Sequence, residues 1–191
     1  MSSISEIKTI EHMIFYQYAK IMAKSAFGYK NGKEAKKKSF GYIRSVACKL
    51  INGEIKWSDI SREDWQFIEA EKKCFYCGSK ENLEREHIVP RCINIKPECK
   101  TCERILGIHN QIWACKDCNG AGGKGVKGLY TFYHDMYPEE KKFQDIIDPL
   151  VEKKYLKTIY YCHECNGTLH LGDLDGDGII TVFDIDFCIK R

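Results

Sequence analysis

The chain has 191 residues with a formal net charge of +3, from 30 Lys and Arg against 27 Asp and Glu, and it contains 11 cysteines. Hydrophobic residues make up 43% of the chain, and no stretch approaches the roughly 20 continuous apolar residues of a membrane span, so wholesale disorder and membrane insertion are both excluded. Because the N-terminus lacks the basic and apolar regions of a secretory signal, the cysteines favour metal ligation in a reducing compartment, and we expect a cytoplasmic protein, nucleoid-associated in a prokaryote.

Hydrophobic periodicity predicts helices through the first 71 residues. Apolar side chains recur every three or four positions over residues 10–22 and again over 36–51. A capping signal from Ser61 to Asp64 predicts a short third helix. Lysines crowd residues 30–44, and the sequence leaves open whether they form a solvated surface or a patch that contacts phosphates.

The middle of the chain changes character, and helical periodicity returns in the tail. Residues 83–89 and 108–114 each fit a short strand, and a helix is expected to start near Cys115. An apolar stripe predicts another helix over residues 145–166, with Gly167 as its end. We therefore expect a mostly helical α+β protein.

Charge divides the chain in the same way. Residues 1–71 carry a net charge of +3, residues 72–128 carry +5 and residues 129–191 carry −5. The basic middle segment holds most of the cysteines, which points to a polyanionic partner. We expect a helical N-terminal region, a cysteine-rich middle domain and a helical C-terminal region with these bounds.

Eight of the cysteines form four C-x-x-C pairs. Two such pairs supply the four thiolates of a tetrahedral zinc site, because a two-residue spacing lets both sulfurs face one ion. Four pairs can be matched in three ways, so spacing alone does not identify the partners. The pairs are Cys74/Cys77, Cys99/Cys102, Cys115/Cys118 and Cys162/Cys165.

The segments between these pairs resemble the HNH endonuclease family. They read CFYC at 74–77, EHIVP at 86–90 and NQIWACKDCN at 110–119. The family pattern is an acidic residue and His before a hydrophobic pair and Pro, then Asn five residues before a C-x-x-C that is followed by His or Asn. The resemblance implies a ββα-metal nuclease core within residues 72–128. It also implies one structural Zn²⁺ bound by Cys74, Cys77, Cys115 and Cys118.

The resemblance implies roles for residues between the zinc ligands. His87, whose side chain titrates near neutral pH, would be the general base that activates water. Glu86 and Asn119 offer oxygen ligands that suit Mg²⁺ or Mn²⁺, although Asn119 could instead cap a helix. Asn110 would position His87 by pinning the loop between the strands. Basic residues expected to contact DNA are Arg85, Arg91, Lys124 and Lys127.

The chain departs from the family in two respects. The acidic residue is Glu86, where Asp is more usual, so its carboxylate lies about one bond further from the backbone. The stretch from His87 to Asn110 is also long, and it contains three cysteines. Two interpretations of the remaining C-x-x-C pairs stay open: buried thiols, or a second zinc site. Its ligands would be Cys99, Cys102, Cys162 and Cys165.

The tail contains a segment with the pattern of a 12-residue calcium loop. Oxygen-bearing side chains stand at positions 1, 3, 5 and 12, and Gly stands at position 6. The sequence allows a structural Ca²⁺ loop or a loop that folds without the ion. The candidate ligands are Asp173, Asp175, Asp177 and Asp184.

Together these patterns favour a metal-dependent HNH endonuclease that hydrolyses DNA. One such site cuts one strand, so a double-strand break would require a homodimer or two binding events. The alternative from another class is a zinc-stabilised nucleic-acid-binding module without catalysis. A third hypothesis is a calcium-dependent interaction protein built on the tail loop.

Overall fold

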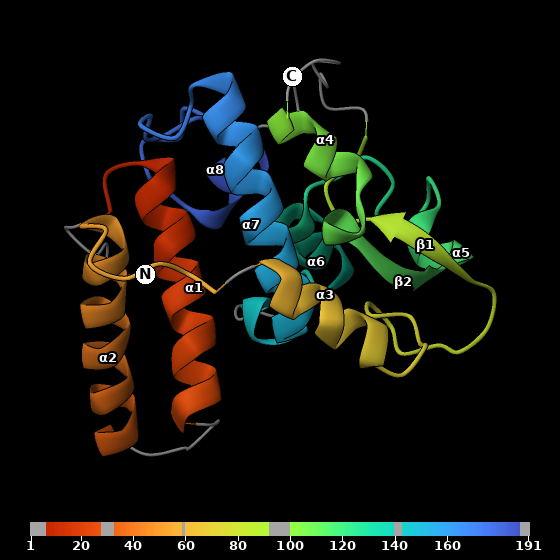
Figure 1. Ribbon diagram of the computed structural model, residues 1–191, viewed down its shortest axis with the longest axis horizontal. Coiled ribbons are helices and arrows are strands. Elements are labelled where there is room, and N and C mark those ends of the chain that lie inside the picture. Colours follow the sequence, from red (N-terminus) through yellow and green to blue (C-terminus); the bar gives the residue numbers. More distant parts are fainter. Residues whose placement is uncertain (1–6, 28–32, 59, 92–99, 140–142, 188–191) are drawn as a thin grey trace.

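Figure 1 shows the computed structural model of the chain, which describes residues 7–27, 33–58, 60–91, 100–139 and 143–187. The protein is a mostly helical α+β structure with one two-stranded antiparallel sheet in the described ranges. None of the helices described there combines the length and the apolar character needed to cross a membrane.

Helices α1 (Ile10–Phe27) and α2 (Lys33–Ile51) lie side by side at one end of the molecule (Figure 1). Their apolar faces, each predicted from the sequence, pack against each other, and α2 begins three residues earlier than expected. The backbone N–H of Ile10 donates to the carbonyl of Leu171 at 2.7 Å. The C-terminal region therefore packs against the start of α1.

Helix α7 (Pro149–Asn166) runs through the middle of the molecule and contacts α1, α3 (Ile60–Glu69) and α4 (Lys100–Leu106). It begins four residues later than expected, because Asp148 caps it by accepting from the N–H of Leu150 at 2.8 Å. It ends at Gly167 as expected, in a left-handed conformation with φ of 68°.

One face of α7 is charged as well as buried. The ammonium of Lys157 lies 2.6 Å from a carboxylate oxygen of Glu63, and that of Lys154 lies 2.7 Å from Asp64. Glu63 and both lysines are almost fully buried. These two ion pairs hold α3 against α7, and the apolar stripe seen in the sequence gave no sign of them.

The sheet pairs β1 (Leu83–His87) with β2 (Gln111–Cys115), with His87 opposite Gln111 at one end and Leu83 opposite Cys115 at the other. Both strands are shorter than predicted, and residues 108–110 form the 3₁₀ turn η1 (Ile108–Asn110) instead. The sheet and the short helix α5 (Lys116–Asn119) lie across α7 from the α1–α2 pair (Figure 1).

Three helices and a second 3₁₀ turn had no predicted bounds, although residues 129–191 were expected to be helical. They are α4, α6 (Leu129–Met136), α8 (Val182–Asp186) and the turn η2 (Phe143–Asp145). Residues of all three charge-defined regions belong to one hydrophobic core. The regions therefore pack together around α7.

Candidate functional site

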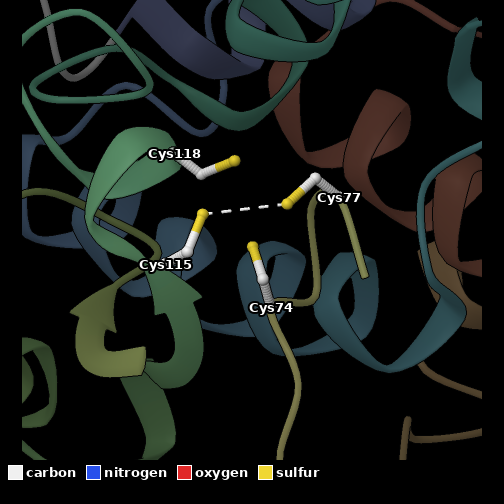
Figure 2. A group of neighbouring side chains, drawn as sticks. All are labelled: Cys74, Cys77, Cys115 and Cys118. Carbon is white, nitrogen blue, oxygen red and sulfur yellow. Dashed lines mark hydrogen bonds between the residues drawn. The ribbon is translucent and has the colours of Figure 1, made fainter. Parts of the chain in front are cut away.

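Four cysteines converge beside the sheet. Cys74 and Cys77 come from the turn before β1, Cys115 ends β2, and Cys118 lies in α5. Their sulfur atoms all lie within 4.8 Å of one another (Figure 2), and those of Cys77 and Cys115 are 3.7 Å apart. Zn–S bonds of about 2.3 Å place the sulfurs of a tetrahedral site about 3.8 Å apart. The cluster is thus consistent with a zinc site, and it unites the two pairs that the family resemblance implied.

The backbone of the first pair forms a tight turn around the sulfurs. Gly78 donates its N–H to the carbonyl of Cys74 at 2.8 Å and has a positive φ of 79°, which favours glycine. Burial acts to raise the pKa of Cys74, but backbone N–H groups of Cys115, Cys77 and Tyr76 outweigh it and the pKa is lowered. These N–H groups favour the thiolate of Cys74, the form that binds zinc, whereas burial raises the pKa of Cys77 in the same turn and that of Cys118 in α5.

Glu86 points into the interior beside Lys124. The ammonium of Lys124 lies 3.0 Å from a carboxylate oxygen of Glu86, and both side chains are almost fully buried. Burial raises the pKa of Glu86, and the positive charge of Lys124 opposes that rise. Neither carboxylate oxygen has a hydrogen bond of regular geometry within the described part of the chain, although Lys124 and the hydroxyl of Tyr76 both lie near enough to lower the pKa of Glu86. These two buried oxygens retain the capacity to bind a cation.

Asn119, which was expected to share a divalent metal with Glu86, contacts the neighbouring carboxylate of Glu84. It donates its side-chain N–H to Glu84 at 2.7 Å, and Glu84 shares a face of β1 with Glu86 because alternate strand residues point the same way. Asn119 is the last residue of α5, so it does not cap the start of that helix. The sequence interpretation overlooked Glu84, although its two-residue spacing from Glu86 could have identified it.

His87 ends β1 on the face opposite to Glu86. The side-chain nitrogen of Gln111, its cross-strand partner, lies 3.4 Å from Nε2 of the imidazole. Burial lowers the pKa of His87, the charge of Arg91 lowers it further, and a hydrogen bond with the backbone of Leu106 acts in the opposite direction. The net effect favours the neutral imidazole, which is the form that can accept a proton.

Asn110 is fully buried and fastens the segment that follows His87. Its side-chain oxygen accepts from the N–H of Val89 at 2.8 Å, and its side-chain nitrogen donates to the carbonyl of Val89 at 2.7 Å. The same nitrogen donates to the carbonyl of Ile105 in α4 at 2.9 Å. The amide therefore joins the end of β1 to α4. Beside it, the ring of His109 contacts Asp64 of α3.

The four basic residues expected at DNA differ in exposure. Arg85 and Arg91 are exposed, and the guanidinium of Arg85 lies 5.6 Å from the ring centre of Trp113. Lys127 is half-exposed and pairs with Asp135 at 2.7 Å. Lys124 does not lie on the surface where a phosphate contact was expected, because its ammonium is buried against Glu86.

The basic segment at residues 30–44 is described only in part. Lys38 and Arg44 are exposed on α2, while the side chains of residues 33–37 and the whole of residues 30–32 lie outside what the structure describes. The surface and phosphate-contact interpretations of this segment both stay predictions.

Three of the four carboxylates expected to bind calcium gather in the tail. Asp173, Asp175 and Asp177 form an exposed cluster, and Asp173 accepts from the N–H groups of Gly176 and Gly178, both at 2.7 Å. Asp184 does not join that cluster: it is buried, accepts from the backbone N–H groups of Leu174 and Thr181, and belongs to the capping box at the start of α8. Its carboxylate is already used by the loop itself.

Comparison of the chain with known protein families, with curated proteins and with solved structures found no match.

Proposed function

We propose that the protein is a metal-dependent HNH endonuclease that hydrolyses DNA phosphodiester bonds, with His87 as the general base. One observation carries the proposal: the buried amide of Asn110 holds the backbone of Val89, two residues after His87. His87 lies at one end of the two-stranded sheet, and the cysteine cluster lies at the other. A module that only bound nucleic acid would have no need for a histidine fixed in this way.

The surroundings of His87 suit proton transfer. The lowered pKa favours the neutral imidazole. The ring contacts Gln111 and is only half-buried, so solvent can reach it at the end of the sheet. A water molecule placed between this ring and a phosphate would lose its proton to the imidazole as it attacks phosphorus. Arg85 and Arg91 are exposed and lie two residues before and four residues after His87. Their guanidinium groups would attract the phosphates of a DNA strand.

A catalytic divalent cation, Mg²⁺ or Mn²⁺, would neutralise charge on the phosphate and on the departing oxygen. The oxygens of Glu86 suit such an ion, because they are buried carboxylate oxygens without a hydrogen bond of regular geometry in the described structure. Glu84 lies two residues before Glu86 on the same face of β1 and accepts from Asn119, so these two side chains would supply the further oxygen ligands. The ammonium of Lys124, now paired with Glu86, would have to give way, so Lys124 would compete with the cation.

Nicking of supercoiled plasmid DNA tests the proposal. We expect nicked circles with Mg²⁺ or Mn²⁺ and none with EDTA. Because EDTA can also extract structural zinc, a sample treated with EDTA and then given excess Mg²⁺ must recover nicking, which separates the two metals. DNA that is retained but never nicked under any metal condition would reject the endonuclease and favour the zinc-stabilised binding module.

A further inference from the structure

A second group of cysteines lies between α4 and α7. The sulfur atoms of Cys102 on α4 and Cys165 on α7 are 3.6 Å apart, although the two residues are 63 positions apart in sequence. That separation is far longer than the roughly 2.05 Å of a disulfide bond. None of the described cysteines forms a disulfide. The fold therefore brings two thiols into contact without joining them.

Cys162 lies one helical turn before Cys165 on the same side of α7. It is almost fully buried, and its thiol donates to the carbonyl of Thr158 at 3.4 Å. Helices α4 and α7 pack directly against each other. Cys102 of α4 and Cys165 of α7 thus meet at one helix–helix contact, and Cys162 stands one turn earlier on α7, where its thiol would have to turn from Thr158 to join them.

We propose that Cys102, Cys162 and Cys165 are ligands of a second structural zinc ion that joins α4 to α7. The 3.6 Å between the sulfurs of Cys102 and Cys165 is close to the roughly 3.8 Å edge of a tetrahedral thiolate site. Binding removes the thiol proton of Cys162 and so ends its hydrogen bond to Thr158. Cys99, the fourth ligand that the sequence suggests, lies outside the described residues.

The end of α4 shows what this ion would stabilise. The carbonyl of Ile105 accepts from Asn110, and the backbone of Leu106 lies close enough to His87 to act on the pKa of its imidazole. Both residues come within four positions of Cys102. A zinc ion that fixes α4 on α7 would therefore fix the backbone against which Asn110 and His87 are held. The zinc content itself does not depend on whether the protein cleaves DNA.

Zinc stoichiometry tests the proposal. Chains purified under reducing conditions are assayed by inductively coupled plasma mass spectrometry, with protein quantified by amino-acid analysis. We expect two zinc ions per wild-type chain, one in Cys102→Ser and one in Cys115→Ser. Cys48→Ser, which changes a half-buried cysteine of α2 away from both groups, should retain two.

The wild-type count decides the question even if a variant does not fold. One zinc ion per wild-type chain, or two ions retained by folded Cys102→Ser, would overturn the proposal. Non-reducing mass spectrometry that finds Cys102 and Cys165 in a disulfide in the native chain would do the same. Absence of nicking with two zinc ions bound would reject the proposed endonuclease and leave the second zinc site standing.

Discussion

Replacement of Asn110 by Ala should be among the most destabilising single changes in the sheet region. The change removes three hydrogen bonds from a side chain with no exposed surface, and it leaves Val89 N–H and the carbonyls of Val89 and Ile105 without their partner. Each net hydrogen bond is worth about 1 kcal/mol, and a buried group left unsatisfied costs about 1–3 kcal/mol. The expected loss of unfolding free energy is therefore about 3 kcal/mol or more.

For a chain of this size, about 1 kcal/mol shifts Tm by roughly 2–4 °C, so Asn110→Ala should lower Tm by roughly 6–12 °C. Differential scanning calorimetry measures the shift. Asn52→Ala is the matched control, because Asn52 is exposed and makes one local hydrogen bond to Glu54. Equal Tm values for the two variants would refute the reasoning. Asn110→Asp should also destabilise, since its carboxylate cannot donate to either carbonyl.

Two further pairs of variants test the packing around the site. Gly123→Ala should lower zinc content and Tm, because a Cβ there would lie 2.3 and 2.4 Å from two backbone oxygens of α5. Gly122→Ala is its control: nothing lies within 4 Å of the added Cβ, so its zinc content and Tm should match those of the wild type. Lys157→Met should cost about 3–5 kcal/mol in urea unfolding, because it leaves the carboxylate of Glu63 buried and unpaired. Lys80→Met removes an exposed ion pair and should leave the urea midpoint unchanged, so similar losses in the two Lys variants would contradict the role given to burial.

The cysteine cluster was predictable because each C-x-x-C turn is a local feature of the chain. Joining the two turns across 38 positions needed the family resemblance, and the structure places the four sulfurs together as that resemblance implied. The end of β1 was predicted two residues too late. Asn110 occupies the backbone groups of Val89 that a longer strand would have used, and sequence periodicity does not register such a contact.

The charged interior was not predictable from local patterns. Lysines normally remain exposed, so Lys124 was expected at DNA, and no local pattern indicated that Lys157 would be buried. Each is buried because a carboxylate distant in sequence meets it, Glu86 in one case and Glu63 in the other. Helix α4 was missed for another reason: it has seven residues, too few for a periodic apolar pattern to emerge.

The most direct test of the central claim is the rate at which His87→Ala nicks supercoiled plasmid DNA with Mg²⁺ or Mn²⁺ under single-turnover conditions. Loss of a general base typically slows such a step by about 10²- to 10⁴-fold, so we expect a decrease of at least about 100-fold. His170→Ala, which changes an exposed histidine of the tail, should nick at the wild-type rate. Circular dichroism melting must show that both variants fold. Wild-type nicking by a folded His87→Ala protein would contradict the account.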